Sequence, residues 1–434
     1  MDQLIARAAS ARLRELVRAF RVVIVNGPRQ AGKTTLLEMF HAEEGGTLRS
    51  LDDADMRRAA VDDPVSFAAQ GSRPLVIDEV QRGGNDLVLA IKRAVDTDRG
   101  RGQFVLSGSS RFLTIPTLSE SLAGRAVFVD LWPLSAAERF GASADFIDQV
   151  FTEPGRFVGA ESQWSRQEYL ELLCGGGFPE VAELTSGVAR RAWFDSYVDT
   201  VAVKDVQQFA HVQQITALPR LLELVAARSG SSLVLRDLGE ALGLTHATTR
   251  SYLSYLETVF AVEEVTAWST NLSSRVTKSP KAFLTDTGLA AHLLQVSADD
   301  LQTIGHPALG PLVENFVFTE LLKMRALTTR GFRLFHYRDR DGREIDFVCE
   351  GPGGRVVAIE VKASQSPRRS DSANLAWLRD RLGDRFTAGI VLYLGHNSLS
   401  LGDRLYLLPI SAMWNHGFAP YAVDDGQVRP RNVE

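Results

Sequence analysis

The loop GPRQAGKT at residues 27–34 constrains this chain more than any other feature of its sequence. It follows a short β-branched apolar run, RVVIVN at residues 21–26, and it precedes the helix-forming residues 35–39, TLLEM. A strand, a glycine-containing loop and a helix are therefore expected in that order. In this setting the loop is predicted to wrap the phosphates of a nucleotide, because its backbone N–H groups and the start of the helix attract an anion.

The residue types of the loop match the needs of phosphate binding. Gly27 and Gly32 let the backbone approach the phosphates closely. Lys33 offers charge to the β and γ phosphates, and the Thr34 hydroxyl can ligate magnesium. A chance match in a glycine turn is the alternative, and the flanking strand and helix argue against it. We expect the nucleotide to be bound by Gly27, Pro28, Arg29, Gln30, Ala31, Gly32, Lys33, Thr34 and Thr35.

A second apolar run, LVI at residues 75–77, ends in Asp78 and Glu79. The first carboxylate can hold magnesium beside the nucleotide, and the second can polarise the attacking water. Alone, this run could be an ordinary strand end with solvent-facing acids, but the upstream loop favours a hydrolytic site. The sequence therefore predicts an ATPase with ATP and Mg²⁺ as cofactors, in which Lys33 and Glu79 are catalytic.

Two more polar residues are candidates for the phosphate end of this site. Ser109 follows the apolar run 104–106 and is predicted to sense the γ phosphate, unless it only caps the next turn. Arg125 could supply positive charge to a phosphoryl group in a neighbouring subunit, which implies a homo-oligomer. The alternative for Arg125 is a surface salt bridge. The rival arginines are Arg29, Arg82 and Arg111.

Several motifs together resemble one family, the bacterial and archaeal AAA-type ATPases with a C-terminal restriction-endonuclease-like domain. The resemblance runs in sequence order through most of the chain, and it implies an AAA-type ATPase that forms a homo-oligomer, with a hexamer as one candidate assembly. The motifs are GPRQAGKTT, LDD at 51–53, DPVSF at 63–67, VIDEVQR, LSGSS, SLAGR, GGGFPE at 175–180 and SYVDTVAVKDV at 196–206.

The middle of the chain reads as two helical units. Residues 141–225 are mostly compatible with helix and are predicted to form a helical lid. Further on, the helical patterns at 235–242 and 245–258 flank Gly243, with Thr245 placed to cap the second helix, which is the spacing of a helix-turn-helix. Two strand-like runs follow and could form a wing. Residues 226–300 are therefore interpreted as a winged-helix-like module.

Contact between this module and DNA stays open at the sequence level. The second helix offers Arg250 as its cation, together with His246. Arg275, Lys278 and Lys281 fall on the expected wing loop, where they could bind phosphates. The alternative is a module that serves packing alone.

The last part of the chain follows the element order of the nuclease fold named above. A helix from residue 311 precedes strands at 332–339 and 343–350, with a turn at Asp341–Gly342 between them. A third strand at 355–363, a helix at 372–382 and a strand at 387–395 follow. The order is helix, three strands, helix and strand.

Three residues of this part are candidates for metal-dependent phosphodiester chemistry. Glu360 and Lys362 are two apart on the third strand and share a face, and Asp346 lies on the neighbouring strand. Asp346 and Glu360 would bind Mg²⁺, Lys362 would stabilise developing charge, and Glu314 would add a ligand. This set resembles the PD-(D/E)XK signature, with EID at 344–346 replacing the proline–aspartate pair. The alternatives are an exposed strand with an ion pair, or a nuclease fold kept for binding alone.

Length and composition place these parts in an α/β protein of several domains. A formal net charge of -5 neither indicates nor excludes DNA binding, and the cysteines Cys174 and Cys349 give no disulfide framework or thiolate zinc site. The start lacks a continuous apolar run, so a cytoplasmic protein without a membrane span is expected. The predicted domains are AAA-type at 1–140, helical lid at 141–225, winged-helix-like at 226–300 and nuclease-like at 301–434.

The leading interpretation is an ATP-hydrolysing AAA-type protein that acts on or with DNA. Its C-terminal metal-dependent nuclease-like domain would bind or cut that DNA, and the expected partners are ATP or ADP, DNA and further copies of the chain. The alternative is a nucleotide-controlled regulatory switch that assembles with a protein partner and whose nuclease fold is inactive.

Overall fold

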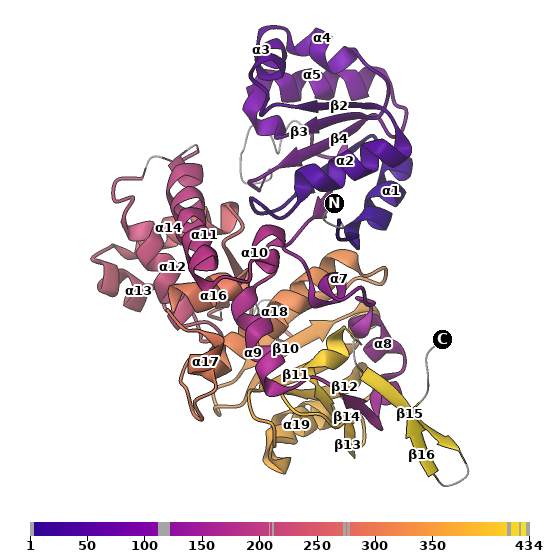
Figure 1. Ribbon diagram of the computed structural model, residues 1–434, viewed down its shortest axis with the longest axis vertical. Coiled ribbons are helices and arrows are strands. Elements are labelled where there is room, and N and C mark those ends of the chain that lie inside the picture. Colours follow the sequence, from indigo (N-terminus) through magenta and orange to yellow (C-terminus); the bar gives the residue numbers. More distant parts are fainter. Residues whose placement is uncertain are drawn as a thin grey trace.

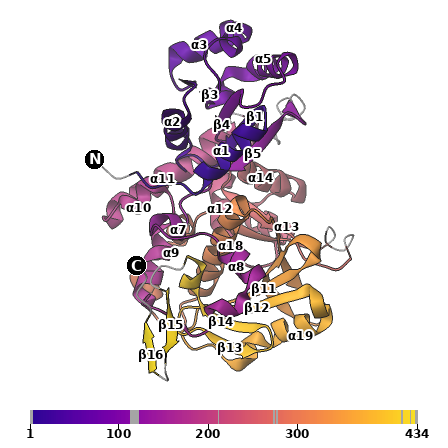
Figure 2. The same cartoon turned by 90° about the vertical axis from the view of Figure 1, so that its right-hand side faces the viewer.

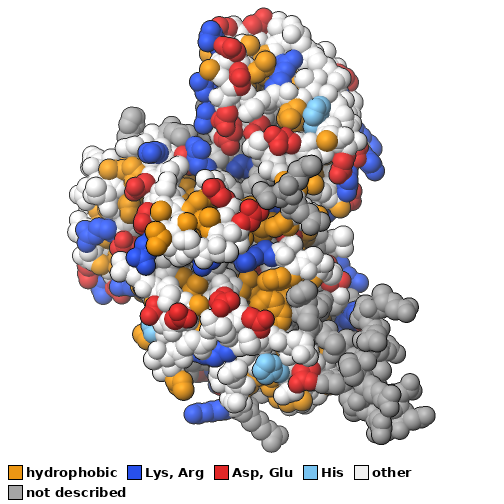
Figure 3. All heavy atoms as spheres, viewed as in Figure 1, with side chains coloured by type: hydrophobic (Ala, Val, Ile, Leu, Met, Phe, Trp, Pro, Cys, Tyr) orange, Lys and Arg blue, Asp and Glu red, His pale blue; other side chains and the backbone are white. Residues whose placement is uncertain are grey.

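The computed structural model describes residues 4–111, 122–207, 209–210, 212–271, 275, 278–414, 418–424 and 427–430, with the backbone alone for Arg369 and for the last two segments. Figures 1 and 2 show an N-terminal domain at one end and a larger body, built from the middle and C-terminal parts, at the other. The space-filling view in Figure 3 shows the N-terminal domain as an upper lobe on this body.

The N-terminal domain is a five-stranded parallel sheet with helices on both faces. The strand order is β2-β3-β4-β1-β5. Its strands are apolar runs because both faces are covered: the alternate residues Val22 and Ile24 join one core and Val23 and Val25 the other. The elements are α1 (Ala9–Ala19), β1 (Val22–Asn26), α2 (Lys33–Glu44), β2 (Thr47–Ser50), α3 (Ala54–Asp62), α4 (Pro64–Ala69), β3 (Leu75–Asp78), η1 (Val80–Gly83), α5 (Gly84–Thr97), β4 (Phe104–Gly108) and β5 (Ala126–Asp130).

The middle part contains the predicted pair of short helices. Gly243 ends the first helix in the left-handed conformation, and the Thr245 side chain accepts a hydrogen bond from the Thr248 N–H at the start of the second. The two strands that follow pair antiparallel, and the winged-helix assignment stays a prediction. The elements are α9 (Arg166–Gly175), α10 (Pro179–Glu183), α11 (Gly187–Val198), the π-helix η4 (Asp199–Asp205), α12 (Ala217–Ala227), α13 (Leu235–Leu242), α14 (His246–Thr258), β7 (Val262–Val265), β8 (Lys281–Leu284), α16 (Thr287–Leu293) and α17 (Ala298–Leu301).

The C-terminal part is a six-stranded mixed sheet in the order β13-β14-β12-β11-β10-β9. Strands β9, β10 and β11 are antiparallel, whereas β11, β12 and β14 are parallel, and the predicted sequence of helix, three strands, helix and strand is present. The elements are α18 (Leu309–Leu327), β9 (Arg333–Arg338), β10 (Glu344–Glu350), η5 (Pro352–Gly354), β11 (Val356–Lys362), η6 (Arg369–Ser372), α19 (Ala373–Leu382), η7 (Gly383–Arg385), β12 (Phe386–Tyr393), β13 (Leu399–Gly402), β14 (Leu405–Pro409), η8 (Ile410–Met413), β15 (Phe418–Asp424) and β16 (Gln427–Pro430).

The start of the predicted lid packs on the C-terminal sheet instead of the N-terminal domain. This segment contains α8 (Phe146–Thr152), the 3₁₀-helix η3 (Pro154–Phe157) and β6 (Ala160–Ser162), and it follows α7 (Ala136–Arg139). Arg355 donates to the Phe151 carbonyl at 2.8 Å, and Thr328 donates to Asp148 at 2.7 Å. The apolar face of α8 is buried there, so residues 146–162 belong structurally to the C-terminal body.

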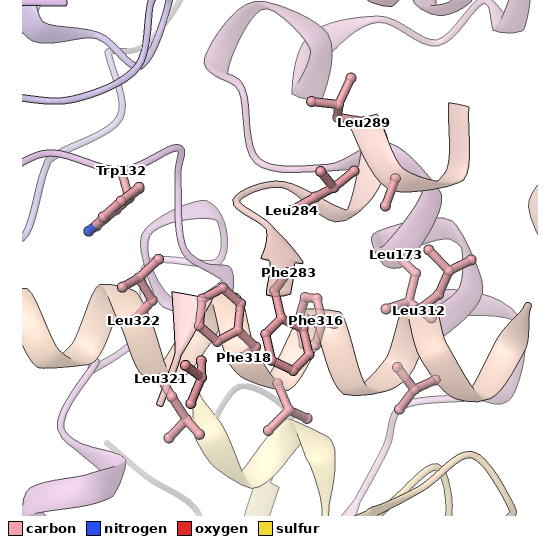
Figure 4. Close-up of a cluster of buried hydrophobic side chains, with 14 of the residues drawn as sticks. Trp132, Leu173, Phe283, Leu284, Leu289, Leu312, Phe316, Phe318, Leu321 and Leu322 are labelled. Carbon is pink, nitrogen blue, oxygen red and sulfur yellow. The ribbon is translucent and has the colours of Figure 1, made fainter. Parts of the chain in front are cut away.

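One hydrophobic core runs through the middle and C-terminal parts, as Figure 4 shows. Phe283 of β8 stacks on Phe318 of α18 with ring centroids 4.5 Å apart, and Leu173 of α9 belongs to the same cluster. The predicted boundaries near residues 225 and 300 therefore do not separate independent cores. Both cysteines are buried here.

Within the described residues, every helix is too short or too polar to cross a lipid bilayer.

Candidate functional site

The predicted phosphate-binding loop lies between β1 and α2, at the carboxyl edge of the sheet. Strand β4 lies between β1 and β3, so the ends of these three strands meet at this edge. A Cβ atom on Gly27 would lie 2.0 Å from the Leu131 carbonyl oxygen, and Gly32 has a φ of +91°. Glycine is therefore required at both positions, as the loop motif predicts.

Lys33 is buried inside the loop. Its Nζ donates to the carbonyl oxygens of Gly27 at 3.1 Å and Pro28 at 2.8 Å. Burial lowers the pKa of Lys33, although the nearby carboxylates of Glu79 and Asp78 oppose that shift. The ammonium group thus lies where the loop would hold phosphates.

Thr34 and Asp78, the two predicted magnesium ligands, are brought together. The Thr34 hydroxyl donates to Asp78 Oδ2 at 2.8 Å, and the Ser107 hydroxyl donates to Asp78 Oδ1. One hydroxyl oxygen and one carboxylate oxygen at the start of a helix fit Mg²⁺, which keeps several waters and phosphate oxygens as its other ligands. Thr34 and Asp78 would therefore hold the ion.

Glu79 directly follows β3 and has an unusual backbone conformation. Its φ of 54° and ψ of 46° are left-handed, which is rare outside glycine and is found at functional sites. The Ser107 hydroxyl accepts from the Glu79 N–H at 3.0 Å, and Glu79 Oε2 accepts from Ser109 at 3.2 Å and from the Gln81 amide. Ser109, the predicted sensor, thus lies beside the predicted water-activating carboxylate.

The arginine candidates are all engaged by carboxylates. Arg125 lies at the amino end of β5, opposite the nucleotide edge, and donates to both oxygens of Asp96 at 2.6 and 2.9 Å. It therefore does not reach the site of its own chain, and a role in a neighbouring subunit stays a prediction. Arg82 pairs with Asp52 at 2.9 Å, and Arg29 pairs with Asp205 at 2.5 Å.

Arg111, three residues beyond the end of β4, contacts α14 and β7 of the middle part. Its N–H donates to the Thr258 carbonyl and its Nε to the Glu257 carbonyl, both at 2.9 Å. Its guanidinium group also pairs with Glu263 and covers the ring of Phe260.

A cavity of about 450 Å³ lies over the loop, and six of its fourteen lining residues come from the middle part of the chain. The motifs GGGFPE and SYVDTVAVKDV carry several of these residues, although the sequence gives no mechanism for them. Arg7 is a further residue that the sequence does not reveal, because it donates to the Ala31 carbonyl at 2.6 Å and so braces the loop. The wall residues from the middle part are Pro179, Glu180, Trp193, Ser196, Tyr197 and Thr200.

The C-terminal sheet brings Asp346, Glu360 and Lys362 together on the adjacent strands β10 and β11. Asp346 Oδ2 accepts from the Val361 N–H at 2.8 Å, and Lys362 Nζ donates to Glu360 Oε1 at 2.7 Å. Burial, followed by the charge of Asp346, raises the pKa of Glu360 to about 8, and its Oε2 is buried without a hydrogen-bond partner among the described residues. These two carboxylates fit a divalent cation.

The position of Lys281 bears on the prediction that Glu314 is a metal ligand. The sequence places this lysine on an exposed wing loop, but it begins β8 and its side chain is 1% exposed. Its Nζ lies 2.9 Å from Glu314, 2.8 Å from Glu344 and 3.7 Å from Asp346. Although burial lowers the pKa of Lys281, the surrounding carboxylates raise it overall, so the ammonium stays charged.

Glu314 is therefore paired with an internal ammonium group and is not available as predicted for a metal ion. In the described part of the chain, no three residues among His, Cys, Asp and Glu are arranged to hold a metal. Asp346 and Glu360 remain as the predicted metal ligands.

Arg275 and Arg250 also differ from the prediction of phosphate-binding cations. Arg275 is buried and donates to both oxygens of Glu350 at 2.7 and 2.8 Å, because that carboxylate is itself buried and needs a partner. Arg250 pairs with Glu264. Lys278 is partly exposed and donates to the Arg338 carbonyl at 3.0 Å.

A groove of about 800 Å³, here called the basic groove, lies between Lys278, strand β9 with the turn that follows it at residues 339–343, and helix α19. It carries five cationic side chains against two carboxylates, and it includes the rings of Tyr337 and Trp377, with centroids 5.5 Å apart. Its cations are Lys278, Arg338, Arg340, Arg343 and Arg381, and its carboxylates are Asp339 and Asp341.

Three family descriptions match successive parts of the chain. Residues 19–140 match an AAA domain. Residues 166–300 match a domain of unknown function (DUF8612), and residues 309–413 match another (DUF4143). The first match covers the loop, Asp78, Glu79 and Ser109, and the geometry of these residues agrees with it. The N-terminal part is therefore an AAA-type P-loop ATPase domain.

Two relatives match almost the whole chain. They are uncharacterized proteins from Mycobacterium bovis and Mycobacterium tuberculosis, each 29% identical over 413 residues, which is 95% of this chain and 85% of the relative.

Solved structures with detectable likeness include AMPPCP-bound DnaA from Aquifex aeolicus and the RuvB Holliday junction branch migration motor from Thermotoga maritima. DnaA is 16% identical with a TM-score of 0.29, covering 58% of this chain and 89% of DnaA. RuvB is 18% identical with a TM-score of 0.28, covering 60% and 90%. TM-scores this low support no conclusion about this chain.

Proposed function

We propose that this protein is an AAA-type ATPase that acts on DNA, which it binds in the basic groove beside Asp346 and Glu360. The groove is the observation that carries the proposal. Its arginines Arg338, Arg340 and Arg381 are exposed, so their charges can contact the phosphates of a DNA strand. Tyr337 and Trp377 add aromatic surface on which bases can stack.

The position of the groove relative to the carboxylates also supports this function. Ser232 lines the groove, and its backbone pairs with that of Lys281 in an isolated antiparallel β-bridge. The ammonium group of Lys281 in turn contacts Asp346. Arg343 of the groove directly precedes Glu344, the first residue of β10, which shares a face with Asp346. A DNA strand in the groove would therefore run close to the carboxylates.

Asp346 and Glu360 would hold Mg²⁺, which would supply Lewis-acid chemistry to a phosphodiester there. Lys362, 2.7 Å from Glu360, would stabilise charge that develops on the phosphate. We propose assembly into a homo-oligomer as the arrangement in which Arg125 would meet a neighbouring nucleotide.

The test of DNA binding is a titration of labelled single-stranded and duplex DNA at several salt concentrations. The triple variant Arg338→Gln/Arg340→Gln/Arg381→Gln should weaken binding and reduce the slope of log affinity against log salt by about two to three. The matched control, Arg18→Gln/Arg58→Gln/Arg99→Gln, removes the same charge from exposed positions in the N-terminal domain and should change little. If both triple variants and the unmodified protein bind DNA with equal affinity, the proposal that DNA binds in the basic groove is refuted.

A second function is favoured by Lys281, whose ammonium group already neutralises the acidic cluster. In this case the protein is a nucleotide-controlled switch that assembles with a protein partner, and the nuclease-like part does not cut. The two functions differ in one measurement. Asp346→Ala and Glu360→Ala should each abolish magnesium- or manganese-dependent nicking of DNA while ATP hydrolysis persists, whereas the switch predicts no nicking by the unmodified protein.

A further inference from the structure

Helix α11 presents one face to the nucleotide cavity. Trp193, Ser196 and Tyr197 are spaced by three and four residues, and Thr200 continues the same row into the π-helix η4. All four line the cavity that the phosphate-binding loop also lines. The helix is thus the wall opposite the loop, and it lies more than 150 residues further along the chain.

The two aromatic residues of this face form a rigid surface. The rings of Trp193 and Tyr197 are parallel within 9° and their centroids are 5.1 Å apart. Phe178 contacts both, with its ring centroid 5.2 Å from that of Trp193 and 4.6 Å from that of Tyr197. Since three rings restrain one another, the wall is already formed before a ligand arrives.

Trp193 also carries a donor that the protein does not satisfy. Its Nε1 is buried and has no hydrogen-bond partner among the described residues. A buried N–H without an acceptor is destabilising, and a bound ligand is one source of the missing acceptor.

The other end of the cavity fixes the orientation of a nucleotide. Lys33, Thr34 and Glu79 line the cavity at the carboxyl edge of the sheet, and this set can bind phosphates and magnesium but not a base. The remaining part of a nucleotide must therefore extend away from the loop, and α11 offers the aromatic surface that a base requires.

We propose that Trp193, supported by the buried Tyr197 ring that stacks on it, binds the nucleoside end of the nucleotide, with a purine ring against the Trp193 side chain and the Trp193 N–H donated to an acceptor on the base or ribose. The inference rests on nucleotide binding by the loop. It assigns a chemical role to the segment SYVDT, and it makes α11 part of the ATP site.

The test compares ATP with inorganic tripolyphosphate, which has the phosphates but no nucleoside. Both are titrated with magnesium into the full-length protein, and affinity is measured by calorimetry. Trp193→Ala should weaken ATP binding at least about five-fold, the loss expected for one base–aromatic stack, and leave tripolyphosphate affinity within about two-fold. Trp193→Phe keeps a ring but removes the N–H, so its affinity for ATP should be intermediate.

Two controls separate this inference from general damage. Val188 lies on the same helix but is 81% exposed and does not line the cavity, so the Val188→Ala variant should bind ATP like the unmodified protein. In the unmodified protein, ATP should change tryptophan fluorescence, and this change should shrink in Trp193→Phe.

Equal losses for ATP and tripolyphosphate in Trp193→Ala, or no loss for either, would overturn the role of α11. Unaltered ATP binding in Lys33→Ala would instead show that the loop itself has been misassigned. The two failures are therefore distinguishable.

Discussion

Replacing Lys281 by methionine tests the internal ammonium group that lies among three carboxylates. Methionine keeps most of the length and apolar volume of the lysine stem, so packing in β8 should survive. The ammonium group would be lost from within 2.9 Å of Glu314 and 2.8 Å of Glu344. We expect Lys281→Met to destabilise the junction of β8, α18 and β10.

The magnitude follows from burial and distance. Removing one partner of a buried ion pair typically costs about 3–5 kcal/mol, because the other charge is left uncompensated. Two features lower that cost here: burial and Asp346 raise the pKa of Glu314 to about 8, so it can take up a proton, and Glu344 is partly exposed to water. We therefore expect Lys281→Met to lower the free energy of unfolding by about 3 kcal/mol.

Native-state hydrogen exchange of the amides of α18 and β8 measures this loss locally. Lys278→Met is the matched control, because Lys278 is partly exposed and its recorded hydrogen bond is to the Arg338 carbonyl, so its effect should stay within about 0.5 kcal/mol. The double variant Lys281→Met/Glu314→Gln should regain at least about 1 kcal/mol, since it removes the carboxylate left without its cation.

If the amides of α18 exchange as slowly in Lys281→Met as in the unmodified protein, the ammonium group of Lys281 does not stabilise this cluster and the reasoning is refuted. A double variant that is less stable than the single variant would do the same, because the two side chains would then act independently.

Three further predictions concern other sites. Glu79→Gln should still bind ATP but hydrolyse it about 10²–10⁴-fold more slowly, which a phosphate-release assay measures, and undiminished turnover would mean another residue activates the water. Gly27→Ala should weaken ATP binding at least about ten-fold, because the new Cβ would lie 2.0 Å from the Leu131 carbonyl, and normal affinity would contradict that clash. Burial raises the pKa of Glu257 to about 7, so its contribution to stability is present below about pH 4.5 and is lost as pH rises through 7. Glu257→Gln should therefore melt higher than the unmodified protein at pH 8 but not at pH 4.5, and a shift that does not depend on pH would exclude this cause.

The local features of the site could be read from the sequence because each depends on neighbouring residues. Gly27, Gly32 and Lys33 are set by a loop between a strand and a helix, and the carboxylates that end β3 follow a recognisable apolar run. The element order of the C-terminal sheet was predictable for the same reason, since alternating runs and the turn at Asp341–Gly342 define its strands.

The rest depends on contacts between distant parts of the chain. Lys281 looks like a surface cation until the fold brings Glu314, Glu344 and Asp346 around it. Trp193 has no signal of its own as a nucleotide contact, because it reaches the loop only through the packing of α11. The sequence identifies the charged and aromatic side chains, but it does not show which of them the fold buries next to one another.

Arg111 has a practical consequence for taking this protein apart. Arg111 lies two residues beyond Ser109 and three beyond the end of β4, and its main-chain and side-chain contacts hold this segment against the corner between α14 and β7. A fragment that stops near residue 140 would keep the phosphate-binding loop, Asp78, Glu79 and Ser109, but it would lose the contacts of Arg111 and the α11 side of the cavity. ATP turnover measured on such a fragment would describe a site that lacks the α11 wall of its cavity and the contacts of Arg111. Kinetic comparisons therefore require the intact chain.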